Sequence, residues 1–136
     1  MKSPDAKAGD QTALVNLAFR VKDLSEVERF VESTDGWRKN ALHDIGGDIF
    51  LEASFGGVRV NFFHSALYDD AQTTTAPGFL HASYNVAKLD DMLANEAWAK
   101  ALVWGPSVIS GGFGHRRIAF FEPLPGCRIE LMEDLA

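Results

Sequence analysis

The fold is decided by the stretch Asn16-Leu17-Ala18-Phe19-Arg20-Val21, which returns later in the chain as His81-Ala82-Ser83-Tyr84-Asn85-Val86. A second stretch, Arg59-Val60-Asn61-Phe62, returns as Arg128-Ile129-Glu130-Leu131. The first pair opens each half of the chain and the second pair closes it. A repeat of this length predicts a duplicated supersecondary unit. It also defines four equivalent positions, which are occupied by Asn16, Asn61, His81 and Glu130.

Each half is predicted to have the order β-α-β-β-β. Alternating and β-branched residues predict strands, at 14–21, 37–44, 48–55, 58–64, 79–86, 106–109, 117–121 and 127–133. The capping-box spacing of Ser25 and Glu28 predicts the start of the first helix, and a second helix is expected from Leu89 to about Ala101. Two segments without periodicity are expected to be irregular: the connector 65–78 and a flexible loop at 110–114.

Alternation along the opening and closing strands gives each of them one apolar face and one polar face. The polar faces carry Asn16, Ala18 and Arg20; His81, Ser83 and Asn85; Arg59, Asn61 and Phe63; and Arg128, Glu130 and Met132. The apolar faces are expected to pack under the helices. The polar faces could meet bulk water, as in many antiparallel sheets, or the sheets could curl so that these faces line a shared cavity.

Composition limits the class of protein. The chain has 136 residues, enough for one domain with its own core, and a net charge of −6, which argues against nucleic-acid binding. The single cysteine, Cys127, cannot form an intrachain disulfide, so a reducing cytoplasm is the expected location. The polar start, residues 1–12, is expected to be a mobile tail and not a signal peptide, and no apolar stretch long enough for a membrane span occurs.

Several segments resemble the vicinal oxygen chelate superfamily, which includes glyoxalase I, bleomycin-resistance proteins, extradiol dioxygenases and methylmalonyl-CoA epimerase. The resemblance rests on residues 14–24, on 80–86, and on 112–121 running into Gly126-Cys127-Arg128-Ile129-Glu130-Leu131-Met132-Glu133. It implies an α+β fold in which two tandem βαβββ modules form curved mixed sheets that enclose a cavity. The modules would span about 13–64 and 79–136 of a single domain, 13–136, with 65–78 as the linker.

The resemblance also implies where a metal would bind. In metal-dependent members the ligands come from the first and last strands of each module, which here gives Asn16, Asn61, His81 and Glu130. His81 and Glu130 are good ligands for Zn, Ni, Mn or Fe, whereas the two amides are poor ones. The expected site is therefore degenerate, with no cofactor, and the alternative is a divalent metal held weakly by His81 and Glu130.

Strand parity and the resemblance together predict a ligand pocket. The candidate ligand-binding residues are Asn16, Arg59, Asn61, Phe63, His81, Ser83, His115, Arg128, Glu130 and Met132. Three alternatives stay open at this point. Glu130 could pair with Arg128 inside the cavity; Arg59 and Arg128 could meet an anionic ligand group or lie in water at the rim; and His115 could be a general base, a missing ligand or a surface residue.

Two functions follow from these expectations. The first is a metal-free protein that sequesters an amphipathic or aromatic small molecule, with no nucleic-acid or membrane partner, as a homodimer in which half-cups pair within or between chains. The second is a lyase, isomerase or dioxygenase that uses His81 and Glu130 as catalytic residues, with or without a metal.

Overall fold

The computed structural model describes residues 12–69 and 76–135, and it has the expected order of two βαβββ modules. The first module comprises β1 (Ala13–Arg20), α1 (Leu24–Ser33), β2 (Trp37–Ile45), β3 (Asp48–Phe55) and β4 (Val58–Phe63). The second comprises β5 (Gly78–Asn85), α2 (Leu89–Leu93), α3 (Glu96–Ala101), β6 (Leu102–Gly111), β7 (Gly114–Leu124) and β8 (Cys127–Asp134). The predicted tail lies almost wholly outside the described residues.

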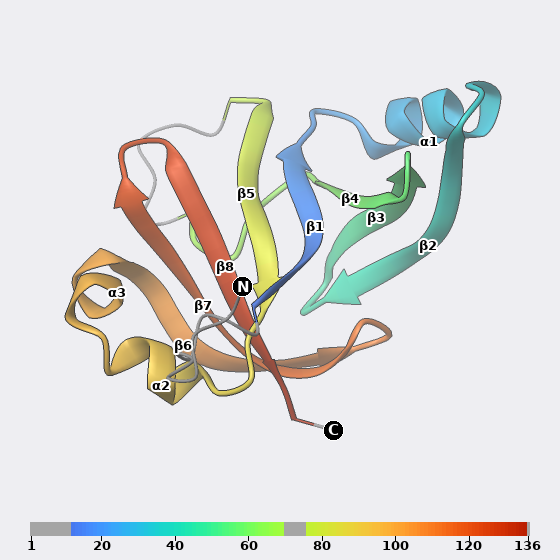
Figure 1. Ribbon diagram of the computed structural model, residues 1–136. Helices are drawn as coiled ribbons and strands as arrows, with labels where there is room; N and C mark the ends of the chain where they lie inside the picture. The colour runs from blue at the N-terminus through green and yellow to red at the C-terminus, as the bar shows by residue number, and fades with distance from the viewer. Residues whose placement is uncertain (1–11, 70–75, 136) are drawn as a thin grey trace.

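The strands form one sheet of eight, in the order β2-β3-β4-β1-β5-β8-β7-β6. Within the modules β1 runs parallel to β4 and β5 runs parallel to β8, whereas β1 and β5 pair antiparallel and join the two modules. The sheet curls into a half-barrel, a cup with its concave side enclosed (Figure 1). The two half-cups therefore pair within a single chain.

Strand register agrees with the repeat. On the parallel pair β1–β4, Asn16 lies beside Arg59. On the parallel pair β5–β8, Ala82 lies beside Ile129, which places His81 beside Arg128 one step earlier along both strands. The repeated residues thus occupy matching places in the two modules.

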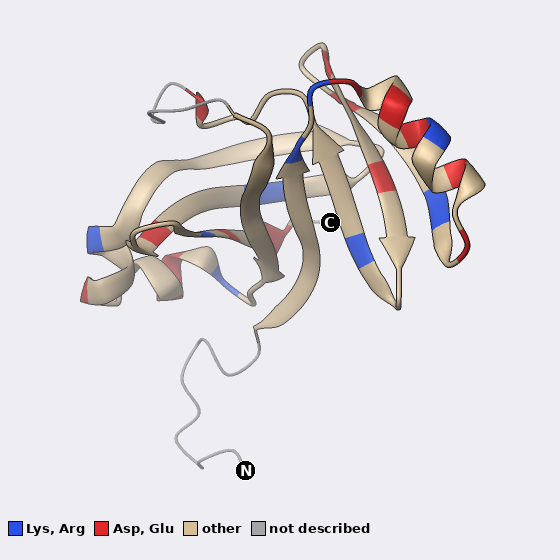
Figure 2. Cartoon of the chain, turned by 90° about the horizontal axis from the view of Figure 1, so that it is seen from above, with Lys and Arg blue, Asp and Glu red and all other residues tan. Residues whose placement is uncertain are grey.

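The polar strand faces line the inside of the cup and do not face bulk water. Of the two alternatives left open by the sequence, the shared cavity is therefore the one observed. Asn16, Ala18 and Arg20 of β1 are all at most 5% exposed on the concave side. Helices cover the two ends of the outer face and leave its middle strands uncovered (Figure 2). Val31 of α1 packs on β3, and the residues Leu89 and Met92 of α2 pack with apolar side chains of β7 and β8.

The first helix begins two residues earlier than the capping-box prediction. Its N-cap is Asp23, whose carboxylate accepts hydrogen bonds from the backbone N–H and the hydroxyl of Ser25. These hydrogen bonds lower the pKa of Asp23. Ser25 therefore supports the cap and is not itself the cap.

The second predicted helix is broken into α2 and α3. Asn95 lies between them, and its side chain accepts hydrogen bonds from the backbone of Ala97 and Trp98. An asparagine in this role caps a new helix, so the chain starts α3 at Glu96 and does not continue α2.

The predicted flexible loop at 110–114 is instead a tight hairpin. The β6–β7 ladder continues to the pair Gly111–Gly114, which leaves Gly112 and Phe113 as the turn. Gly114 has φ +119°, a conformation that side chains other than glycine rarely adopt, so this residue permits the turn.

The described part of the connector enters the cup. Tyr68 is fully buried there and joins a core cluster with residues of both modules, including Ala18, Leu80, Ile118 and Phe120. Besides lying between the two modules, the first residues of this segment thus contribute a large aromatic side chain to the core of the cup.

Candidate functional site

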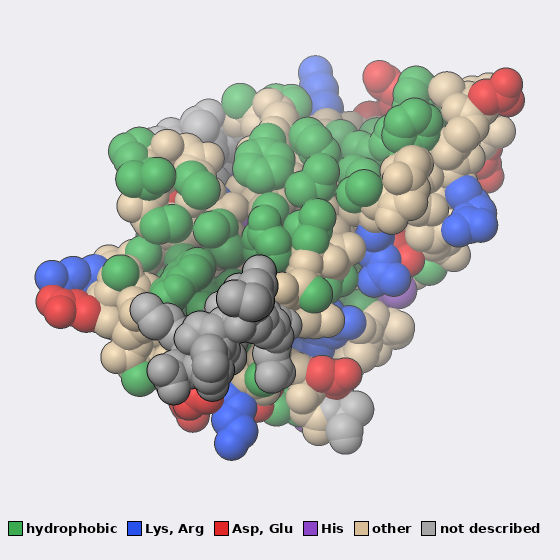
Figure 3. Space-filling view, viewed as in Figure 1, with side chains coloured by type: hydrophobic (Ala, Val, Ile, Leu, Met, Phe, Trp, Pro, Cys, Tyr) green, Lys and Arg blue, Asp and Glu red, His purple; other side chains and the backbone are tan. Residues whose placement is uncertain are grey.

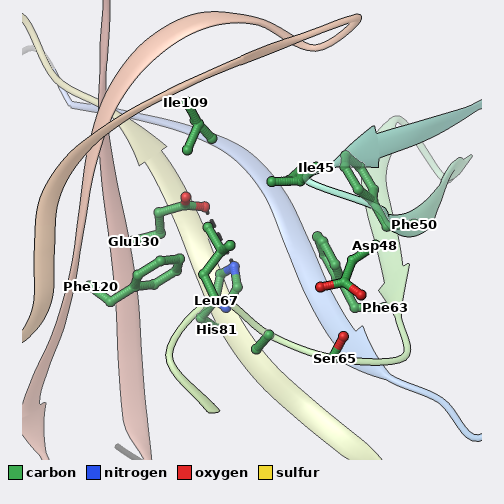
Figure 4. Close-up of a pocket in the computed structure, with 11 residues that line it drawn as sticks. Ile45, Asp48, Phe50, Phe63, Ser65, Leu67, His81, Ile109, Phe120 and Glu130 are labelled. Atoms are coloured by element: carbon green, nitrogen blue, oxygen red, sulfur yellow. Dashed lines mark ion pairs between the residues drawn. The ribbon is translucent and has the colours of Figure 1, made fainter. Parts of the chain in front are cut away.

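Two adjoining hollows lie on the concave side of the sheet. The first encloses about 480 Å³, part of it open to solvent, and is lined mainly by apolar side chains with His81 and Glu130 at its inner end (Figure 4). Its main apolar walls come from both modules: Phe50 and Phe63 from the first, and Ile109 and Phe120 from the second. This hollow suits an apolar or aromatic group that ends in a hydrogen-bonding atom.

The second hollow is similar in size, about 470 Å³, and more polar. It shares Ile45, Phe50, Phe63, Ile109 and Glu130 with the first and adds Val15, Asn16, Glu52, Arg59, Asn61, Phe113, Arg116 and Met132. The tip of the β6–β7 hairpin reaches across to β2, where the ring of Phe113 packs near His43 and Phe50. A Cβ at Gly112 would lie 3.1 Å from His43 Nδ1, so glycine permits this close approach.

His81 and Glu130 face each other at the base of the cup. His81 Nε2 lies 3.5 Å from Glu130 Oε1, and the same carboxylate oxygen accepts a hydrogen bond of 2.6 Å from the Ser83 hydroxyl. Both His81 and Glu130 are less than a tenth exposed. The pair is thus an imidazole and a carboxylate in contact, each fixed by a further neighbour.

Tyr68 fixes the other side of His81. Its phenol oxygen lies 2.7 Å from His81 Nδ1, and the guanidinium of Arg128 lies 4.5 Å from the centre of its ring. Burial raises the pKa of the Tyr68 phenol above its usual value, so the O–H is retained at neutral pH. When this O–H donates to Nδ1, the proton of neutral His81 is on Nε2 and faces Glu130.

Arg128 is held below the hollows and not at the rim. Its guanidinium pairs with Glu122, with Nε 3.1 Å from the carboxylate, and its side chain is 12% exposed. The ion pair between Glu130 and Arg128 that strand alternation left open is not the one in the structure. Arg128 pairs with Glu122, and Glu130 contacts His81 and Ser83.

The four repeat positions are all buried and face the cup, but their donors fit a tight transition-metal site poorly. Zinc sites generally offer three or four strong ligands, and here His81 and Glu130 are joined by two neutral amides, Asn16 and Asn61. Among residues 12–69 and 76–135, no three His, Cys, Asp or Glu side chains gather closely enough to hold a metal ion. Asn61 Oδ1 is buried without a hydrogen-bond partner, so it can accept a hydrogen bond from a ligand in the cup.

The structure brings together most of the predicted site residues. Those that line the hollows are Asn16, Arg59, Asn61, Phe63, His81, Glu130 and Met132. Ser83 reaches them through Glu130. Arg128 lies outside both linings, and so does His115, which is exposed and bonded to Ser110.

The residues of the site that were not among the predictions include His43, Glu52 and Tyr68, besides apolar lining residues such as Phe50 and Ile109. His43 Nε2 lies 2.8 Å from Glu52 Oε1, and Arg59 Nε lies 3.5 Å from the other oxygen of the same carboxylate. Glu52 could have been found from the sequence, because the β3–β4 hairpin pairs it with Asn61. Tyr68 follows no periodic pattern and left no such signal.

A scan against family models and a search of curated proteins found no match to the sequence. Solved structures do match. A hypothetical protein from Bacillus halodurans C-125 has a TM-score of 0.70 at 15% identity, over 93% of this chain and 96% of that one. Methylmalonyl-CoA epimerase from Mycobacterium tuberculosis has a TM-score of 0.65 at 19% identity, over 90% and 88%.

The chain has the vicinal oxygen chelate fold. A further match, at TM-score 0.67 and 16% identity over 90% of this chain and 94% of that one, is a Streptomyces coelicolor methylmalonyl-CoA epimerase variant in complex with 2-nitronate-propionyl-CoA. At these identities the likeness extends to the fold, and the activity of this chain has to be argued from its own residues.

Proposed function

We propose that this protein sequesters an amphipathic or aromatic small molecule in its cup, at a metal site that has become degenerate. The observation that carries the proposal is the buried, unpartnered Asn61 Oδ1 beside an aromatic-lined hollow. The apolar body of a ligand would lie against Phe50 and Phe63, and a ligand N–H or O–H would bond to Asn61. The single cysteine, Cys127, supports a cytoplasmic location as part of the same proposal.

Filling the cup is expected to abolish ligand binding. Ile109 lines both hollows, so Ile109→Trp would occupy the space that the ligand needs. The neutral fluorescent amine N-phenyl-1-naphthylamine is a suitable probe, because it is aromatic and carries one N–H donor. We expect wild type to bind it and Ile109→Trp to bind at least tenfold more weakly, about 1.4 kcal/mol.

The neighbouring position provides the matched control. Val108 lies on the same strand, is 54% exposed and lines neither hollow. Val108→Trp should therefore bind the probe as wild type does. Equal binding by wild type and Ile109→Trp would place the ligand elsewhere and contradict the proposal.

An enzyme is the second candidate, and the contact between His81 and Glu130 favours it. An imidazole and a carboxylate in one apolar cavity can exchange a proton with a bound substrate. The epimerases of this fold suggest the probe: release of the α-proton of methylmalonyl-CoA into heavy water. If the α-proton exchanges with solvent and the exchange is lost when Glu130 is replaced, an enzyme is the better explanation than a binding protein.

We also propose that two copies form a homodimer. Cup closure does not require a second copy, so the support comes from the outside of the sheet. There, Leu17, Phe19, Phe30, Trp37, Val60 and Phe62 line an apolar groove between α1 and the strands, and hydrophobic side chains gather over β1 and β5 (Figure 3). Phe79 packs against Phe19 beside it and is 50% exposed. An apolar area of this kind is typical of an interface.

Sedimentation velocity tests the homodimer. We expect dimers at micromolar concentration and monomers for Phe79→Glu, since a carboxylate on this face would be buried in the dimer without a partner. Only monomers for wild type would refute the proposed dimer without touching the ligand proposal, because the cup closes within one chain.

A further inference from the structure

We propose that the rim of the cup in the first module binds the oxyanion of the ligand, a carboxylate or a phosphate, between Arg38 and Arg59. The inference rests on the proposed function, because it names the chemical class of the molecule that the cup would hold. It concerns a third hollow, which adjoins the second one at Arg59.

Register places the two arginines on either side of one serine. Arg38 of β2 lies opposite Ser54 of β3, and Ser54 lies opposite Arg59 of β4. All three positions belong to the concave face, in line with Asn16 beside Arg59 on β1. Neighbouring strands are about 4.8 Å apart, so two long guanidinium side chains can converge over the Ser54 hydroxyl.

The lining of this hollow contains no carboxylate. It consists of the two arginines, Asn40, Ser54, Phe55 and three glycines. Within residues 12–69 and 76–135, no carboxylate forms an ion pair with Arg38. The nearest carboxylate to Arg59 is Glu52 at 3.5 Å, and that residue already bonds to His43. The rim therefore carries two guanidinium groups close to a single carboxylate, Glu52, so its net charge is positive.

The repeat gives an internal comparison. Arg128 is the counterpart of Arg59, and in its module Glu122 of β7 neutralises it directly while Tyr68 covers it. In the first module the residue beside Arg59 on the neighbouring strand is Ser54, which is uncharged, and Arg38 adds a second guanidinium. At this place the second module thus has a buried ion pair, whereas the first module has two guanidinium groups on either side of an uncharged serine.

The chemistry of this hollow suits an oxyanion. Guanidinium groups bind carboxylate and phosphate oxygens by paired, charge-assisted hydrogen bonds. The Ser54 hydroxyl, which makes a long contact of 3.5 Å with Asn40 Oδ1, can turn to donate a further hydrogen bond to the anion. Deeper in the cup, Glu52 and Glu130 repel an anion. The field therefore orients the ligand with its charged head at the rim and its apolar body against Phe50 and Phe63.

Calorimetric titration at low salt tests the site with three probes: inorganic phosphate, phenyl phosphate and benzoate. We expect wild type to bind phenyl phosphate or benzoate, and the tighter of the two identifies the preferred head group. Arg38→Gln combined with Arg59→Gln should weaken binding at least tenfold. Ser54→Glu should do the same, because it supplies the carboxylate that the second module has at Glu122.

Arg117→Gln is the matched control. Arg117 pairs with Asp90 of α2 and lines none of the three hollows, yet Arg117→Gln lowers the net charge by one, as Ser54→Glu does. It should bind the anions within twofold of wild type. The proposal is overturned if wild type binds none of the probes, if Ser54→Glu retains wild-type affinity, or if Arg117→Gln weakens binding as much as the rim variants.

The neutral probe separates this site from the proposed function. If N-phenyl-1-naphthylamine binds and the anions do not, the cup holds ligands but the rim site is wrong. If inorganic phosphate binds in an Arg59-dependent way and the neutral probe does not, the rim site stands and sequestration in the cup fails. Ser54→Glu should bind the neutral probe with wild-type affinity and should bind the anions much more weakly than wild type.

Discussion

Tyr68→Ala is expected to destabilise the protein by about 4 kcal/mol, the usual cost of deleting a large buried aromatic side chain. Tyr68 is fully buried although it comes from a connector, and its ring contacts His81 and Phe120. Its removal leaves a cavity at the base of the cup and deprives Arg128 and His81 Nδ1 of a partner. Urea denaturation monitored by circular dichroism measures the loss.

Tyr68→Phe separates the ring from the hydroxyl. It keeps the packing and removes the hydroxyl with its bonds to His81 and Arg128, so we expect a loss of about 1–2 kcal/mol. A loss below about 1 kcal/mol for Tyr68→Ala would contradict the structural role of residues 64–69, since such a value is typical of an exposed side chain.

The second large effect concerns the proposed degenerate metal site. Asn16→His combined with Asn61→Glu should create two imidazoles and two carboxylates at the four repeat positions. Without metal this variant should be less stable than wild type, because the new carboxylate would lie opposite Glu52 on the neighbouring strand and in the same hollow as Glu130. Added Zn, Ni or Mn should restore stability by about 2.7 kcal/mol at a concentration of a hundred times Kd.

Thermal melts with and without metal provide the comparison. Wild type should show little shift, and Asn16→His alone should show an intermediate one. If the double variant folds and its melting temperature ignores all three metals, the four positions do not converge on a common point, and the idea of a preserved but emptied site is wrong.

The inward-facing residues could be predicted because two independent regularities agree. Alternation divides each strand into faces, and the repeat identifies which of these faces are equivalent. Asn16, Asn61, His81 and Glu130 satisfy both and are all buried in the cup. The same repeat predicted the order of elements in each module but left open how the modules pair; the structure joins them through β1 and β5.

What the sequence did not reveal involves local irregularities. His43 faces inward because a bulge between Lys39 and Ala41 reverses the alternation that begins at Trp37. The pairing of Arg128 with Glu122 was hidden by another irregularity, between Phe121 and Leu124. In each case an irregularity in the strand changes which side chains face inward, and a pattern of strict alternation cannot predict that change.

Sequence also gave no information on how the interior would be filled. Tyr68 lies in a segment without periodicity, and its burial depends on the space that the curled sheet leaves between the modules. The exchange of Glu122 for Ser54 between the two halves becomes visible only when strand register shows which residue lies beside each arginine.

The proposed function requires that the cup holds an organic ligand and not a metal. The most direct test is the metal content, by inductively coupled plasma mass spectrometry, of protein purified without chelators or affinity tags from cells supplied with Zn, Ni, Mn and Fe. We expect only a small fraction of a metal ion per chain. One tightly bound divalent ion per chain, lost on replacing His81 or Glu130, would contradict it and would make a metal-dependent enzyme the better explanation of this site.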